Sequence, residues 1–149
     1  MANTYYGSKV SLNANGVNVV EPKTIPAGAI TVISSVVPTE AALNDVFLMT
    51  DIPPYAYIVD LKLDASAALD SGAALRLDVQ DTSATHTFIS QTTIGSAAGV
   101  VDATGMTGGS VGYTYGSTAA RLQIKVHTAA GTFSAGGTLT LATTYTMDP

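Results

Sequence analysis

Tyr57-Ile58-Val59-Asp60-Leu61-Lys62-Leu63 is the clearest run of alternating residues in this chain. Successive side chains of an extended strand point to opposite faces, so a period of two predicts a β-strand with one buried and one open face. The predicted buried face carries Tyr57, Val59, Leu61 and Leu63, and the open face carries Ile58, Asp60 and Lys62.

Three later segments repeat this alternation and indicate further half-buried strands. Their predicted buried residues are Leu75, Leu77 and Val79; Leu122, Ile124 and Val126; and Leu139 and Leu141. The opposite faces carry Arg76, Asp78 and Gln80; Arg121, Gln123, Lys125 and His127; and Thr138 and Thr140. With weaker signals included, strands are expected at about residues 29–37, 45–50, 56–64, 73–80, 86–91, 111–115, 120–127 and 137–146.

The segments between these strands are rich in Pro, Gly, Asp and Ser, which favour turns. Only residues 40–44 and 66–69 suggest helical turns, and both are too short to form stable helices alone. The pattern predicts an all-β fold, an antiparallel β-sandwich of about eight strands that is jelly-roll-like. We expect this domain to span residues 28–149 and to follow an extended N-terminal arm, residues 1–27, which has little strand signal.

Charged residues make up only 11% of the 149 residues, against roughly 25% in typical soluble domains. Ala, Thr, Ser and Gly fill many positions that would usually carry Lys or Glu. Such a surface costs little to desolvate, so the composition favours a protein packed against copies of itself or a partner. A monomer with a neutral surface is the alternative.

The net charge of −5 argues against binding to nucleic acid, which depends on clusters of Lys and Arg. No run of about 18 apolar residues predicts a membrane span, and the amino terminus does not look like a secretory signal. We therefore expect a soluble protein made in the cytoplasm. The absence of cysteine leaves the redox compartment open.

Catalysis is not indicated: Gly108-Gly109-Ser110-Val111-Gly112 matches the Gly-x-Ser-x-Gly pattern of many hydrolases, but it lies in a Gly-rich stretch with no helix predicted after it, unlike the strand-to-helix turn that displays a nucleophile. His86 and His127 each occupy an outward position on a predicted strand, where a solvated or interface histidine is the ordinary interpretation. No enzyme activity and no cofactor are therefore expected.

Metal and nucleotide sites lack their usual motifs. Two isolated histidines without cysteine do not make an ordinary zinc site. The acidic residues Asp60, Asp64, Asp70, Asp78 and Asp81 leave calcium open, but the calcium-loop pattern is absent, and Asp70 and Asp81 are better explained as turn-forming residues. The glycines from Gly105 to Gly112 match no phosphate-binding template.

Four of the six cations lie on predicted open faces: Lys62, Arg76, Arg121 and Lys125. They suggest cross-strand pairs with Asp60 and Asp78, or simply scattered surface charge. A third interpretation is that Arg76 and Arg121 form contacts between subunits, since arginine is enriched at interfaces.

Three parts of the chain resemble the capsid decoration (cement, or auxiliary head) proteins of tailed bacteriophages. These are the opening Met1-Ala2-Asn3-Thr4-Tyr5-Tyr6-Gly7, the centre Ile52-Pro53-Pro54-Tyr55-Ala56-Tyr57-Ile58-Val59-Asp60-Leu61-Lys62-Leu63 with Leu69-Asp70-Ser71-Gly72, and the ending Gly136-Gly137-Thr138-Leu139-Thr140-Leu141-Ala142-Thr143-Thr144-Tyr145-Thr146. The shared layout is a Pro-containing turn before a long strand, a Leu-Asp-Ser turn after it and a Gly-Thr-Leu-Thr closing strand.

The resemblance implies a noncatalytic β-sandwich that binds the major capsid protein on the outside of the virion, as a homotrimer. Tyr5, Tyr6, Lys9 and Val10 of the arm would then contact the shell or a neighbouring copy, together with Arg76 and Arg121. One alternative is a tail- or fibre-associated module that binds a receptor or carbohydrate, with Tyr113 and Tyr115 as its exposed aromatics. Another is a small enzyme or ligand carrier, which would need a pocket with converging polar groups.

Overall fold

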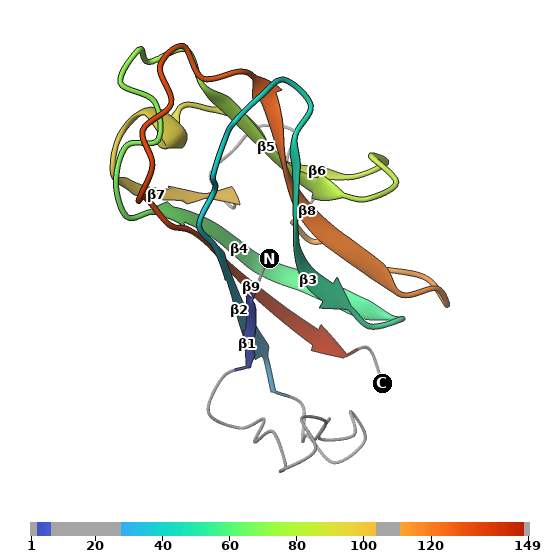
Figure 1. Cartoon of the computed structure of the whole chain (residues 1–149). Coiled ribbons are helices and arrows are strands. Elements are labelled where there is room, and N and C mark those ends of the chain that lie inside the picture. The colour runs from blue at the N-terminus through green and yellow to red at the C-terminus, as the bar shows by residue number, and fades with distance from the viewer. Residues whose placement is uncertain (1–2, 7–27, 104–110, 148–149) are drawn as a thin grey trace.

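The computed structural model describes residues 3–6, 28–103 and 111–147, and within them the regular secondary structure is almost entirely β-strand (Figure 1). The strands are β1 (Asn3–Tyr6), β2 (Ile30–Val36), β3 (Val46–Ile52), β4 (Ala56–Ala65), β5 (Arg76–Asp81), β6 (Thr87–Thr92), β7 (Gly99–Asp102), β8 (Ala120–Thr128) and β9 (Leu139–Met147). The 3-10 turn η2 (Ile94–Ser96) precedes β7. The all-β prediction is confirmed.

The strands form two sheets that pack as the layers of a sandwich (Figure 1). The five-stranded sheet has the order β1-β2-β9-β4-β7, and the four-stranded sheet has the order β3-β8-β5-β6. Every pairing between neighbouring strands is antiparallel.

The strand order is that of a jelly roll. The pairs β2·β9, β3·β8, β4·β7 and β5·β6 are nested, as if one long hairpin with its tip between β5 and β6 had been rolled up. Rolling places alternate parts of this hairpin in opposite sheets and lets β9 pair with β4, and β8 with β5. The predicted jelly-roll-like sandwich is therefore confirmed, with β1 as an additional edge strand.

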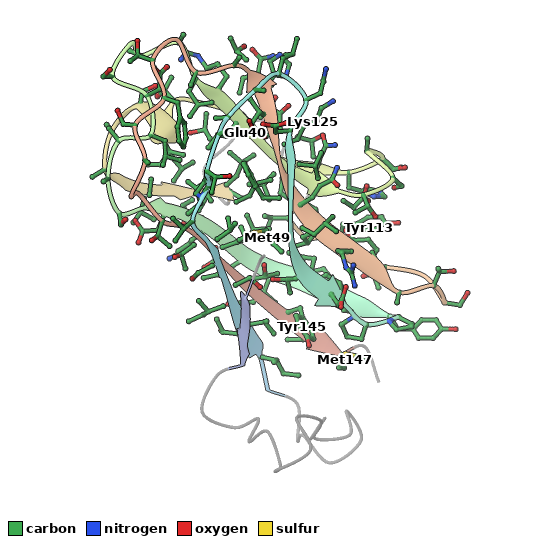
Figure 2. All side chains as sticks on the ribbon, in the orientation of Figure 1. Glu40, Met49, Tyr113, Lys125, Tyr145 and Met147 are labelled. Atoms are coloured by element: carbon green, nitrogen blue, oxygen red, sulfur yellow. The ribbon has the colours of Figure 1, made fainter. Side chains whose placement is uncertain are left out.

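The core lies between the two sheets and is lined by the residues that the alternation selected. The side chains of Leu75, Leu77, Val79, Leu122, Ile124, Leu139 and Leu141 are fully buried. Met49 of β3 fills the space between the sheets (Figure 2). The two-residue period therefore identified the inner faces of β5, β8 and β9 correctly.

The first half of β4 is turned over relative to the prediction. Ile58 is fully buried, whereas Tyr57 and Val59 are each 39% exposed. The reason is a bulge in the pairing with β9, where Ile58 lies opposite Tyr145 and Asp60 lies opposite Thr144, so that Val59 is the additional residue. A bulge of one residue reverses the faces on one side of it, so only Leu61 and Leu63 keep the predicted side.

The outer face of β5 is also less open than predicted. Asp78 and Gln80 are each 7% exposed, because β5 is an inner strand flanked by β8 and β6. Gln80 lies opposite Gln123, which is buried to the same degree. Asp78 accepts hydrogen bonds from the backbone N–H of Gln91 and from His127, at 2.7 and 2.8 Å.

Three local predictions were wrong. Residues 111–115 form no strand of the sheets, although their backbone bonds irregularly to that of residues 55–58 through Ile58, Tyr113 and their neighbours. The strand β7 was not foreseen, because Gly99-Val100-Val101-Asp102 is short and lies in a Gly-rich stretch. Residues 40–44 and 66–69 form bends and turns rather than helical turns.

The beginning of the chain forms the edge of the larger sheet. Asn3–Tyr6 pairs with β2, so that Tyr5 lies opposite Ile33 and Tyr6 opposite Val32. Residues 7–27 lie outside the described residues. The division into an arm, residues 1–27, and a domain from residue 28 stays a prediction.

Candidate interaction surfaces

The outer face of β2 and β9 is free of charged residues. The two strands have the sequences ITVISSV and LTLATTYTM, and their outward hydroxyls pair across the strands, Thr31 with Thr144 at 2.9 Å and Ser35 with Thr140 at 3.1 Å. Between these pairs, Ile33 lies opposite Ala142 and is 40% exposed. Because these hydroxyls satisfy one another, covering this face breaks few strong bonds to water.

The exposed part of β4 extends this face. Tyr57 and Val59, which the bulge turns outward, lie on the strand that follows β9 in the sheet. We call the set Thr31, Ile33, Ser35, Thr140, Ala142, Thr144, Tyr57 and Val59 the neutral face. Its small and apolar side chains suit a flat protein contact better than a solvated surface.

Charge on the larger sheet adjoins this face, because Asp60, Lys62 and Asp64 of β4 lie opposite Thr144, Ala142 and Thr140 of β9. Lys62 of β4 lies 3.5 Å from Asp60 on its own strand and 3.6 Å from Asp102 of β7. The charges of Asp60 and then Asp102 raise the pKa of Lys62. The expected cross-strand partners of the cations were Asp60 and Asp78, with scattered surface charge as the other interpretation; Lys62 instead pairs across the strands with Asp102.

Both predicted contact arginines bond within the chain. Arg121 of β8 donates from Nε and Nη2 to the carboxylate of Asp51 on β3, and this hydrogen bond and charge raise the pKa of Arg121. Arg76 donates from Nη1 to the carbonyl oxygens of Ala73 and Leu75, each at 3.0 Å. Side chains held in this way are preorganised for an added contact, and their role between subunits stays a prediction.

Of the four predicted contact residues of the arm, the structure describes two, Tyr5 and Tyr6, and they lie on the sheet opposite to that of these arginines. Tyr5 and Tyr6 belong to β1, at the edge of the sheet that carries the neutral face. Lys9 and Val10 lie outside the described residues. The structure thus brings Tyr5 next to Ile33 in strand register, while Arg121 belongs to the opposite sheet.

A second candidate site is a hollow of about 420 Å³ beside the turn between β5 and β6. The turn supplies Asp81, Thr82, Ser83, Thr85 and His86, and the segment before β8 supplies Tyr113, Tyr115, Gly116, Ser117, Thr118, Ala119 and Ala120. We call it the tyrosine–histidine hollow. A shallower hollow of about 380 Å³ adjoins it and is lined by Leu48, Asp51 and Arg121, with Thr82, Ala119 and Ala120 in common.

Three rings pack together in the tyrosine–histidine hollow. His86 stacks on Tyr113 with ring centroids 3.8 Å apart, and Tyr115 meets Tyr113 edge-on at 5.0 Å (Tyr113 is labelled in Figure 2). The histidine was expected on an outward strand position, and it lies instead just before β6, with only 21% of its side chain exposed. No local sequence pattern predicts that His86 meets the two tyrosines, because they belong to separate segments of the chain.

Asp81 holds this arrangement together. Its carboxylate accepts hydrogen bonds from Ser83 Oγ at 2.7 Å, from the Thr85 backbone N–H at 3.0 Å and from His86 Nδ1 at 2.8 Å. Burial raises the pKa of Asp81, but these hydrogen bonds outweigh burial and lower it overall, so the group stays ionised at neutral pH. The prediction that Asp81 forms a turn is confirmed.

The predicted acidic clusters do not converge. Among the described residues, no three His, Asp or Glu side chains lie close enough to hold a metal ion. Asp70 is fully buried and binds backbone N–H groups of its own turn, including that of Gly72 at 2.8 Å, as expected for a turn-forming residue. In addition, no helix formed by the described residues has the length and apolar character needed to cross a membrane.

Comparisons with known proteins were made with the whole chain. No protein-family model matches it, and no curated protein matches it. Among solved structures, a chain of the capsid of Ralstonia phage GP4 matches with a TM-score of 0.70 and 23% identity, over 84% of this chain and 90% of that chain. A chain of the cyanophage Pam1 capsid asymmetric unit matches with a TM-score of 0.68 and 22% identity, over 91% of this chain and 97% of that chain. This chain therefore has the fold of these two phage-capsid chains.

Proposed function

We propose that this chain is a structural protein of a tailed-phage virion that binds the outer surface of the capsid and stabilises it. The observation that supports the proposal most is the fold shared with chains of two phage capsids, over 84% and 91% of the present chain. Coverage of this extent leaves little of the chain for an additional domain with a different role. The likeness is one of fold, so the decoration role also depends on the surface chemistry.

The neutral face supplies the physical argument for binding to protein. Association must offset the cost of desolvating polar groups, and this cost is lowest where hydroxyls are already paired and charges are absent. The hydroxyls of Thr31–Thr144 and Ser35–Thr140 are paired and lie on two strands without charged residues, and Ile33 and Val59 add apolar surface between and beside them. We infer that the neutral face contacts the major capsid protein.

The proposed assembly is a homotrimer on the exterior of the capsid. Arg121 and Arg76, on the smaller sheet, point to contacts between copies, while Tyr5, Tyr6, Lys9 and Val10 would contact the shell or a neighbouring copy. The proposal assigns the chain no reaction and no cofactor.

Electron cryomicroscopy of capsids assembled with and without this chain tests the proposal. We expect density of the size of the jelly roll on the outer surface only when the chain is present, and we expect these capsids to resist heating better. Density inside the shell would contradict the decoration role. Density on the tail would favour the alternative, a receptor-binding or carbohydrate-binding module of the tail.

The oligomeric state is tested separately by light scattering. A mass of three chains supports the trimer, and a single-chain mass at high concentration contradicts it without deciding where the protein binds. The capsid experiment therefore tests the place of binding, and the mass measurement tests the trimer, independently of each other.

A further inference from the structure

The tyrosine–histidine hollow has the size and lining of a small-molecule site. Ligand sites usually have volumes of roughly 300–1,000 Å³, and this hollow has about 420 Å³. More than half of its lining side chains carry a hydroxyl group, and Tyr113 adds an aromatic ring.

The charge of the hollow disfavours an anionic ligand. Its lining includes the ionised carboxylate of Asp81 and contains neither Lys nor Arg. The nearest arginine, Arg121 in the adjoining hollow, already donates to Asp51. A phosphate or carboxylate ligand would therefore meet negative charge without a free cation to balance it.

His86 presents a hydrogen-bond acceptor. Because the carboxylate of Asp81 can only accept, His86 Nδ1, 2.8 Å away, must carry the proton of that hydrogen bond. In the neutral imidazole, Nε2 then has a free lone pair. The ring is held in place from one side by Asp81 and from its face by Tyr113, so this acceptor is preorganised.

Tyr115 presents a hydroxyl that the protein leaves unsatisfied. The residue is 6% exposed, and its Oη has no hydrogen-bond partner among the described residues. Burial, followed by the charge of Asp81 and the neighbouring Tyr113, raises the pKa of Tyr115 well above its usual value. A buried hydroxyl without a partner is costly, and a ligand that bonds to it would recover that cost.

We propose that the tyrosine–histidine hollow binds a neutral saccharide unit, with the Tyr115 hydroxyl and His86 Nε2 bonded to its hydroxyl groups. Saccharide hydroxyls both donate and accept, so one can donate to Nε2 while another accepts from Tyr115. This binding is additional to the capsid role and does not depend on it, because the hollow is a separate site beside the β5–β6 turn and the start of β8.

Titration of the ¹⁵N-labelled full chain, followed by NMR, tests this proposal. The probes are glucose, galactose, mannose and N-acetylglucosamine at millimolar concentrations, with glucuronate as the anionic counterpart. We expect saturable shifts for at least one neutral sugar, confined to the amides of residues 81–86 and 113–120. No saturable shift with any neutral sugar, shifts confined to other residues, or tighter binding of glucuronate would each overturn the proposal.

Tyr115→Phe separates binding from folding. The substitution removes only Oη, which bonds to nothing in the described chain, so the melting temperature should not fall. The affinity for the sugar should fall up to about tenfold, the value of one hydrogen bond. Tyr55→Phe is the matched control, because Tyr55 is 54% exposed and does not line the hollow. Equal affinities of the two variants would contradict the assigned role of Tyr115.

Discussion

Asp70 Oδ1 accepts the backbone N–H of Thr132 at 2.9 Å and so joins two loops that lie 62 residues apart in the sequence. Its Oδ2 accepts the N–H groups of Ala74 and Leu75, each at 2.7 Å. The hydrogen bond from Thr132, followed by those from Leu75, Gly72 and Gly131, outweighs burial and holds the pKa of Asp70 far below its usual range. One carboxylate thus fastens the β4–β5 loop to the β8–β9 loop.

Asp70→Asn is expected to lower the melting temperature by several degrees, because an amide nitrogen would face N–H donors in place of one oxygen. Asp64→Asn is the control, since Asp64 is exposed on β4. Differential scanning calorimetry at neutral pH compares the two. Equal melting temperatures would show that the carboxylate does not fasten the loops.

The pH dependence of stability should also change in the Asp70→Asn variant. The folded-state pKa lies below the unfolded value of about 3.9, so the carboxylate stabilises the fold fully above that pH and loses this contribution as the pH falls below it. We would measure the free energy of unfolding with urea from pH 6 downward, in steps of about one pH unit. As the pH falls, this free energy should decrease less for the variant than for the wild type. Parallel curves would contradict this assignment.

The bulge at Val59 predicts opposite responses from two adjacent apolar residues. Ile58→Ala should cost about 2–5 kcal/mol, because Ile58 is fully buried between the sheets. Val59→Ala should change the free energy of unfolding by no more than about 0.5 kcal/mol, because Val59 is on the exposed face. Urea denaturation of both variants measures the difference, and a larger loss at Val59 would place the bulge elsewhere.

Sequence alone could identify most strands, but not which alternate residues of β4 face the core. Arg121, Gln123 and Lys125 alternate with apolar residues without interruption, so β8 admits one assignment of faces. Ile58 and Val59 are adjacent and both apolar, so residues 57–63 fit two phases, and only the pairing of Ile58 with Tyr145 decides between them. Pairing partners across 87 residues of chain are not visible in a local pattern.

The tyrosine–histidine hollow could be predicted only in part. Asp81 and His86 are five residues apart, and their turn chemistry is local. Tyr113 and Tyr115 reach them only because the rolled hairpin brings the segment before β8 to the β5–β6 turn. The paired cation–carboxylate contacts likewise follow strand register, which gave Arg121 the partner Asp51 rather than Asp60 or Asp78.

The packing around Gly137 leaves no room for a side chain. A Cβ at this position would lie 2.7 Å from Leu69 Cδ2 and 3.0 Å from the carbonyl oxygen of Ala67. Gly137→Ala should therefore cost about 1–3 kcal/mol. Gly116→Ala is the control, because a Cβ there meets nothing within 4 Å. Thermal unfolding of both variants should rank them in this order, and a Gly137→Ala variant as stable as the control would contradict the close contact with Leu69.

Deletion of residues 1–10 tests the proposed role of the arm in capsid binding. It removes β1 together with the predicted contact residues Tyr5, Tyr6, Lys9 and Val10, but it leaves the nested pairs of β2–β9 intact. We expect the circular dichroism spectrum to stay that of the full chain, and we expect the variant to be lost from capsids when they are purified and imaged. The double variant Tyr5→Ala, Tyr6→Ala keeps the backbone of β1 and so separates its side chains from its strand pairing. Full occupancy of capsids by the deletion variant would contradict a role of the arm in binding and would leave the neutral face as the proposed surface that binds the shell.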